Sequence, residues 1–126
     1  LGPYALQAAI AACHARARTA GATDWARIVA LYDALVEITR SPVVALNRAV
    51  AVGMAFGPAA GLDLVDELAD EPSLRAYHLL PAVRGDLLEK LGRTDEARVE
   101  FERAARLAGN TRERALLLSR AKAPSN

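Results

Sequence analysis

The sequence predicts an all-α protein in which about seven helices form antiparallel pairs, stacked as a right-handed superhelix. Apolar residues make up 52% of the 126 residues and aromatic residues only 5%, with alanine and leucine dominating the apolar set. Small side chains let helix axes approach closely, so this composition favours helix-on-helix packing. Strands would need β-branched and aromatic residues in alternation, whereas the valines here stand in alanine-rich runs such as residues 43–46.

Three glycines indicate a repeated unit. Gly21, Gly57 and Gly92 are separated by 36 and 35 residues, close to the ~34 residues of a tetratricopeptide repeat, which is one pair of helices. Glycine suits the bend between paired helices because its backbone enters the left-handed region without a steric cost. Residues 91–97, followed by Phe101, resemble the second half of such a repeat, in which small residues flank an aromatic one. The sequence therefore predicts three tetratricopeptide-like helix pairs and a capping helix.

The first three helices are expected over residues 3–19, 24–39 and 42–56. Apolar residues at three- and four-residue steps give each of the first two a buried stripe. These residues are Leu6, Ile10, Cys13 and Ala17, then Ile28, Leu31, Leu35 and Ile38. Thr23 or Asp24 can cap the second helix, and Ser41 the third. The third helix is apolar nearly all round, which predicts burial on most of its sides.

The remaining helices are expected over residues 58–68, 73–91, 94–108 and 111–122. Pro81 lies inside the second of these ranges and should kink that helix or split it into two pieces. Asp95 and Glu96 suit the start of the next helix, because they meet the positive end of its dipole. The last helix is expected to cover the open end of the array. We expect one domain over residues 1–122 and a frayed tail over residues 123–126.

Charge and cysteine usage limit the classes of function. The formal net charge is +1, with arginine and glutamate interspersed, whereas a nucleic-acid surface needs a basic stripe. The single cysteine, Cys13, forms no internal disulfide and is compatible with a reducing cytoplasm. No apolar run approaches the ~20 residues of a membrane span. The chain begins without methionine or a visible signal peptide, so we expect a fragment of a longer cytoplasmic protein.

The sequence predicts no catalytic, metal or cofactor site. Cys13 and His14 are adjacent, so on a helix their side chains point roughly 100° apart, and His78 is distant in sequence. No metal-binding spacing of cysteine or histidine occurs. The glycines of residues 57–61 follow no strand and lack the lysine of a phosphate-binding loop. The acidic residues of 63–71 are interpreted as a solvated helix face, with a cation or basic-partner site as the weaker alternative.

Asn47 is the strongest candidate for a binding residue. It is the one uncharged polar residue in an apolar helix, and isolated polar groups need partners. In a tetratricopeptide array the first helix of each pair lines a concave groove, where amide and imidazole groups can hold the backbone of a bound peptide. Counted from the glycines, the groove is expected to be faced by Gln7, Ile10, His14, Val43, Leu46, Asn47, Val50, His78 and Pro81. The polar members, Gln7, His14, Asn47 and His78, are the predicted protein-binding residues. Alternatively, Asn47 bonds to a loop of its own chain.

Five longer strings carry a more specific resemblance. They are GPYALQAAI (residues 2–10), TDW (23–25), LYDAL (31–35), SPVVALNRAVAV (41–52) and YHLLPAVR (77–84). In this order they resemble the C-terminal extension of a group of extracytoplasmic-function (ECF) RNA polymerase sigma factors, in which a tetratricopeptide-like domain follows the sigma core. The resemblance covers the chain to about Arg120, although the repeats are degenerate at several consensus positions.

The resemblance implies a role in bacterial transcription initiation. The parent protein would direct RNA polymerase to promoters, and this chain would be its regulatory extension, contacting the sigma core, the polymerase or a regulator. The DNA-binding and polymerase-binding domains would lie upstream, so we expect no direct DNA binding by this chain. The alternative is a free-standing peptide-binding scaffold with an unrelated partner. An enzyme is disfavoured because no base, nucleophile or metal ligands converge.

Overall fold

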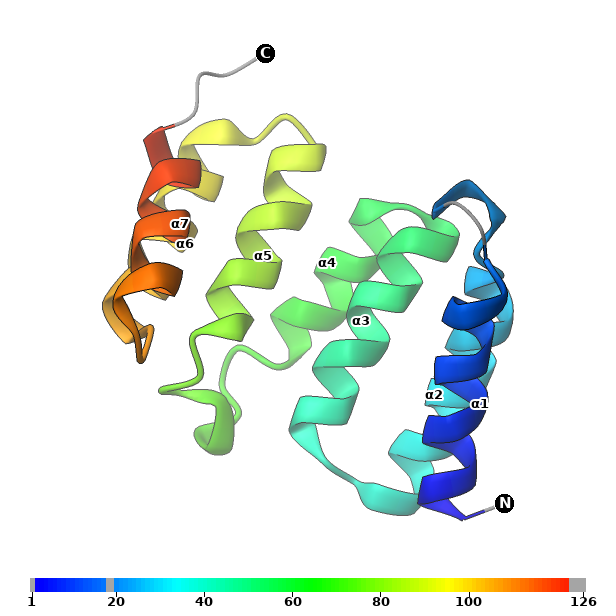
Figure 1. Cartoon of the computed structure of the whole chain (residues 1–126). Coiled ribbons are helices and arrows are strands. Elements are labelled where there is room, and N and C mark those ends of the chain that lie inside the picture. The colour runs from blue at the N-terminus through cyan, green and yellow to red at the C-terminus, as the bar shows by residue number, and fades with distance from the viewer. Residues whose placement is uncertain (1, 18–19, 123–126) are drawn as a thin grey trace. The chain divides into compact units, whose positions relative to one another are not determined.

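A computed structural model describes residues 2–17 and 20–122, and within these ranges the chain forms helices and no strand (Figure 1). The α-helices are α1 (Pro3–Arg16), α2 (Trp25–Thr39), α3 (Pro42–Phe56), α4 (Pro58–Glu67), α5 (Leu79–Lys90), α6 (Thr94–Leu107) and α7 (Thr111–Lys122). Two short 3-10 helices, η1 (Ala20–Ala22) and η2 (Pro72–Leu74), lie in the connections. The prediction of an all-α fold with about seven helices is confirmed.

The helices pack against their neighbours along the chain. Helix α2 contacts both α1 and α3, and α6 contacts both α5 and α7. These contacts divide the chain into two compact units, unit 1 (Leu1–Gly61) and unit 2 (Leu62–Asn126), with the boundary inside α4. The single domain and the right-handed superhelix concern the whole chain and stay predictions, and the predicted tail over residues 123–126 lies outside the described residues.

Local features define the starts of α2 and α3 and the end of α1. The carboxylate of Asp24 accepts a hydrogen bond from the backbone N–H of Arg27 and caps α2, and the Ser41 hydroxyl accepts one from Val44 and caps α3. Helix α1 ends at Arg16, because Ala17 has an extended backbone. The first helix is therefore shorter than predicted, and residues 18–19 of its predicted range are not among those described.

The predicted fifth helix is split, but not at its proline. The chain forms η2, leaves regular helix over residues 75–78, and begins α5 at Leu79. Pro81 is therefore the third residue of α5, where its missing N–H removes no bond of the helix ladder. Pro81 is compatible with the first turn of a helix, and the break lies before it in the sequence, at residues 75–78.

Two of the three repeat glycines have the expected backbone. Gly57, between α3 and α4, has φ of 103°, and Gly92, between α5 and α6, has φ of 77°, values that favour glycine. Gly21 lies in η1. The turn between α3 and α4 and the turn between α5 and α6 therefore follow the predicted repeat.

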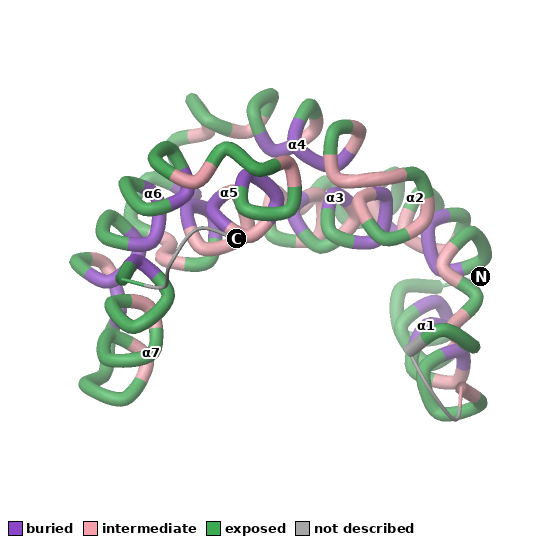
Figure 2. The backbone as a smooth tube through the Cα atoms, turned by 90° about the horizontal axis from the view of Figure 1, so that it is seen from above, coloured by how far each residue is buried: buried purple, intermediate pink, exposed green. Residues whose placement is uncertain are grey.

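Each unit has its own apolar core, and Figure 2 marks the buried positions along the helices. The buried apolar residues of unit 1 are Leu6, Ile10, Cys13, Ile28, Val29, Leu35, Leu46, Ala49, Ala51 and Val52. Those of unit 2 are Leu62, Val65, Leu74, Leu80, Leu87, Leu88, Ala97, Phe101, Ala104, Ala105, Ala108 and Ala121. The predicted stripes are confirmed at Leu6, Ile10 and Cys13 of α1 and at Ile28 and Leu35 of α2. Ala17 and Leu31 are half-buried and Ile38 is 47% exposed.

Candidate protein-interaction site

Helix α3 has an exposed face that joins an amide to apolar side chains. Val43, Val50 and Met54 are 39%, 38% and 43% exposed, and Asn47 is also exposed. These four residues, named here the α3 face, follow each other at steps of four, three and four, so they lie on one side of the helix. The burial predicted for most sides of α3 agrees with the structure, since ten of its fifteen residues are buried or half-buried, and the α3 face is the side that stays open.

The side chain of Asn47 is free within the described part of the chain. It makes no hydrogen bond to any residue of 2–17 or 20–122. Its neighbour Arg48 instead forms an ion pair with Asp33 of α2. The charge on α3 therefore belongs to the contact between helices, while the amide of Asn47 keeps its donors and acceptor available to a partner.

Gln7 and His14 are both exposed on α1, two helical turns apart. The imidazole of His14 meets the edge of the Trp25 ring, with 5.4 Å between ring centroids and 74° between their planes. Trp25 begins α2, so this contact links the end of α1 to the start of the next helix. Among the described residues no hydrogen bond joins Gln7 or His14 to Asn47.

His78 is engaged within unit 2. Its Nε2 atom lies 3.2 Å from the Glu113 carboxylate of α7, and its side chain is 21% exposed. The ring also meets the edge of Tyr77, with 5.9 Å between centroids. His78 thus connects the start of α5 to α7, and a partner would have to compete with Glu113 for its ring nitrogen. The common concave face for His78 and the residues of unit 1 stays a prediction.

Three apolar residues that were predicted to face the groove lie in the cores instead. Ile10 is 4% exposed, Leu46 is 1% exposed, and Pro81 is also buried. Ile10 and Pro81 stand three residues from Gln7 and His78, and three residues on a helix amount to about 300°, an offset of about 60°. Leu46 is adjacent to Asn47, an offset of about 100°. Either rotation is enough to turn a side chain from the open face toward the neighbouring helix.

Sequence reasoning missed a charge cluster around a buried glutamate in unit 2. The side chain of Glu100 on α6 is 7% exposed, and Arg84 and Arg103 approach its carboxylate at 3.8 and 3.9 Å. Arg84 also donates a hydrogen bond to Asp66 of α4 at 2.8 Å. The Oε2 atom of Glu100 lacks a hydrogen-bond partner in the described chain, beside a cavity of about 190 Å³.

This cluster has the composition of a structural charge network. Its two carboxylates and two guanidinium groups balance, and they come from α4, α5 and α6. A cavity of this size and polarity suits ordered water bonded to the Glu100 carboxylate. The sequence signal was present only as the pattern of opposite charges, since which arginine meets which acid depends on the packing of three helices.

The described residues offer no metal site. No group of three or more histidine, cysteine, aspartate or glutamate side chains in residues 2–17 and 20–122 is placed to hold an ion. Cys13 is buried in the core of unit 1. No helix in the same part of the chain is long and apolar enough to cross a membrane.

Comparison with known proteins finds a relative that is longer than this chain. A protein of Rhizobium meliloti, itself uncharacterized, is 50% identical over 116 residues, which is 92% of this chain. The match spans 27% of that protein, so the chain corresponds to about a quarter of its length. No family model matches the chain, and no solved structure matches it.

Proposed function

We propose that this chain is the protein-binding, regulatory extension of a bacterial ECF-type RNA polymerase sigma factor. In this role it acts in the cytoplasm and contacts the sigma core, the polymerase or a regulator during transcription initiation, without catalysis, metal or cofactor. The observation that supports the proposal is the α3 face. It lies within residues 41–54, which include the longest string that resembles these sigma factors, and it is exposed.

The length of the relative agrees with this proposal. Nearly three quarters of the Rhizobium meliloti protein lies outside the matched segment, which leaves room for the two domains of a sigma core. We assign the sigma core of the parent protein as the partner of the α3 face, because a linked segment is held at a high effective concentration.

The α3 face suits a protein contact on chemical grounds. Asn47 offers a carbonyl and an amide group, which together can pair with one peptide unit of a partner backbone, and such a hydrogen bond is worth about 0.5–1.5 kcal/mol net. Val43, Val50 and Met54 supply apolar area around it, and methionine adapts its shape to a partner. An apolar ring that excludes water strengthens the central hydrogen bond.

A binding experiment tests the partner. This chain and the remainder of its parent protein are produced separately, and their dissociation constant is measured by calorimetry. Val50→Glu places a charge on the α3 face and should weaken binding by about tenfold or more, the equivalent of ~1.4 kcal/mol. The matched control is Val99→Glu on α6, which alters a valine that is 60% exposed in unit 2.

The outcomes separate the two candidate functions. Equal loss of affinity in the two valine variants, or no association at all, would reject the α3 face as the contact. If the parent sequence contains no helix-turn-helix or polymerase-binding sigma domain, the alternative of a free-standing peptide-binding scaffold replaces the sigma-factor proposal.

Asn47→Ala tests whether Asn47 binds a partner or has only a structural role. Because Asn47 is exposed and unbonded within the described chain, the change should alter stability by less than about 0.5 kcal/mol. Transcription from the cognate promoter by the full-length variant should nevertheless fall. Normal transcription combined with a lower melting temperature would discard the contact and leave only a structural role.

A further inference from the structure

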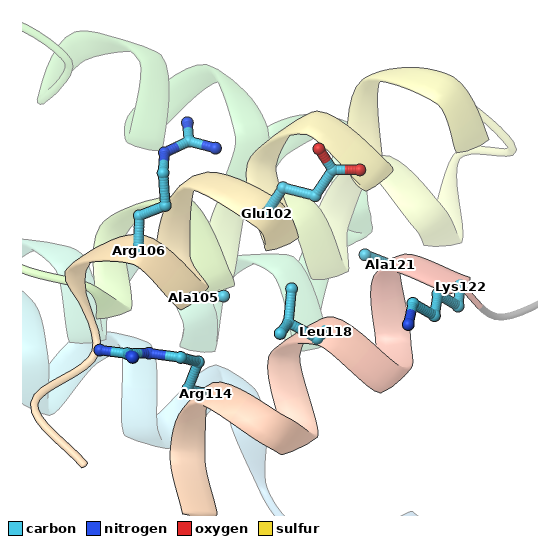
Figure 3. A pocket seen from close by; sticks show the side chains of 7 residues that line it. All are labelled: Glu102, Ala105, Arg106, Arg114, Leu118, Ala121 and Lys122. Atoms are coloured by element: carbon cyan, nitrogen blue, oxygen red, sulfur yellow. The ribbon is translucent and has the colours of Figure 1, made fainter. Parts of the chain in front are cut away.

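A groove between α6 and α7 is separate from the α3 face. Figure 3 shows the side chains that line it. These are Glu102, Ala105 and Arg106 of α6, and Arg114, Leu118, Ala121 and Lys122 of α7. The groove encloses about 570 Å³, a size within the ~300–1,000 Å³ of sites that hold ligands.

The floor of the groove is apolar. Leu118 points from α7 toward Ala105 on α6 (Figure 3), and Ala121 lies one turn further along α7. Ala105 and Ala121 are buried, but Leu118 is 38% exposed. The small alanines leave a hollow beside the leucine, which a side chain from another protein can fill.

Three cations of the groove have no carboxylate partner. Six of the eight other arginine and lysine residues described in unit 2 lie within 4.0 Å of a carboxylate: Arg84, Lys90, Arg93, Arg98, Arg103 and Arg120. Arg106, Arg114 and Lys122 form no such pair with any described residue. With Glu102 as the sole acid, the lining carries a net charge of +2, from three positive charges and one negative.

From this combination we infer that the α6–α7 groove binds an acidic amphipathic helix of a partner protein. An apolar residue of that helix enters the hollow beside Leu118, and its flanking aspartate or glutamate side chains pair with Arg106, Arg114 and Lys122. A groove between two helices matches the ridge of a third, and helix-in-groove recognition uses apolar anchors at steps of three and four residues.

The apolar floor favours a peptide over a nucleic acid. Nucleic-acid contacts go largely to phosphates and make little use of an apolar hollow, while here Leu118 and two alanines form the base between the cations. The inference is independent of the proposed function, because none of its residues belongs to the α3 face.

A peptide selection tests the inference. Helix-forming peptides of about four turns are selected from a random display library on the 126-residue chain, and the selected peptides are measured by fluorescence polarisation. We expect leucine or another apolar anchor flanked by aspartate and glutamate, and binding that weakens as salt is added.

Matched variants on α7 locate the binding site. Leu118→Asp and Arg114→Glu should each weaken the selected peptides by about tenfold or more. The controls are Leu116→Asp, at a leucine that is 60% exposed, and Arg112→Glu, at another exposed arginine; neither lines the groove. Both controls should stay within about twofold of the unchanged chain. Melting temperatures measured in parallel test whether all four variants are folded.

Three results would overturn the inference. Selected peptides without acidic residues would show that the three cations do not determine binding. Control variants that bind the peptides as weakly as the test variants would show that the groove is not the binding site. Binding of duplex DNA or phosphatidylserine vesicles that depends on Arg114, with no acidic peptide selected, would assign the cations to phosphate groups instead.

Discussion

At Gly61, α4 lies close to the backbone of α3. A Cβ atom at this position would be 2.9 Å from the carbonyl oxygen of Ala49 and 2.9 Å from the Cα atom of Gly53. Both are backbone atoms, so neither can move aside unless a helix shifts. Glycine at position 61 therefore sets the distance between two helices within unit 1.

Gly61→Ala should lower the free energy of unfolding by about 1–3 kcal/mol, the usual cost of overpacking. In a helix where the added methyl group met no other atoms, the same substitution would raise the free energy of unfolding by up to ~1 kcal/mol. The clash at position 61 therefore decides whether the substitution stabilises or destabilises the chain. The control is Gly109→Ala, where an added Cβ meets nothing within 4 Å. Urea denaturation followed by circular dichroism measures both, and an alanine at 61 as stable as glycine would contradict the close approach.

Ala97 offers a second test of close packing, on α6. It is 2% exposed, whereas Val99 two residues later is 60% exposed. Ala97→Trp should destabilise the chain by ~1–3 kcal/mol or more, because the core has no room for an indole. Val99→Trp should leave the melting temperature nearly unchanged. Equal melting temperatures for the two variants would show that the face of α6 has been misassigned.

At the scale of elements, side chains near both ends of α7 form polar contacts with other parts of unit 2. Arg120 donates hydrogen bonds to Asp86 at 3.1 Å and to Glu89 at 2.8 Å, both on α5. Its guanidinium carbon lies 4.4 Å from the centre of the Phe101 ring on α6. Near the start of α7, Glu113 pairs with His78. One arginine therefore connects three helices, which a simple capping helix would not require.

Arg120→Ala should lower the stability of unit 2 by about 1 kcal/mol. The side chain is 43% exposed, so solvent screens the ion pairs, while the cation–π contact contributes ~0.5–1 kcal/mol at such a site. Arg112→Ala, at an exposed arginine of the same helix, is the control. Thermal melts at low and high salt measure the difference, which should shrink with salt without vanishing. Equal melting temperatures for the two variants would show that the contacts of Arg120 with α5 and α6 do not stabilise unit 2.

At the scale of the whole molecule, positive and negative charges nearly balance. The chain carries 16 basic and 15 acidic residues, and many of its arginines are paired with acids on the same or a neighbouring helix. Sequence-specific DNA binding rests on a concentrated basic surface, whereas in the described part of the chain these acids lie beside many of the arginines.

We therefore expect the isolated chain to bind promoter DNA no better than unrelated DNA. A mobility-shift assay with both duplexes, at low and at physiological salt, measures the ratio of affinities. Weak binding at low salt that disappears as salt is added is the expected result, because it reports only counterion release. Nanomolar, sequence-selective binding by this chain would contradict the assignment of promoter recognition to another part of the parent protein.

The sequence by itself determined the elements whose signals are local. Ser41 and Pro42 start α3, and Gly57 ends it, because caps, proline and a left-handed glycine act within one turn of the backbone. Binary pattern likewise placed Leu6, Cys13 and Ile28 in the core. The start of α5 was missed because residues 75–78 contain no proline or glycine that would interrupt a helix.

Only the tertiary structure decided which apolar and polar side chains stay open. Residues 43–54 are apolar on nearly every side, so no periodicity in them separates Leu46, which is buried, from Val50, which is exposed; the neighbouring helices make that choice. Arg120 and Asp86 are 34 residues apart, and the α6–α7 groove joins residues 102–122 across two helices. Such contacts depend on how helices pack, and packing is a property of several elements together.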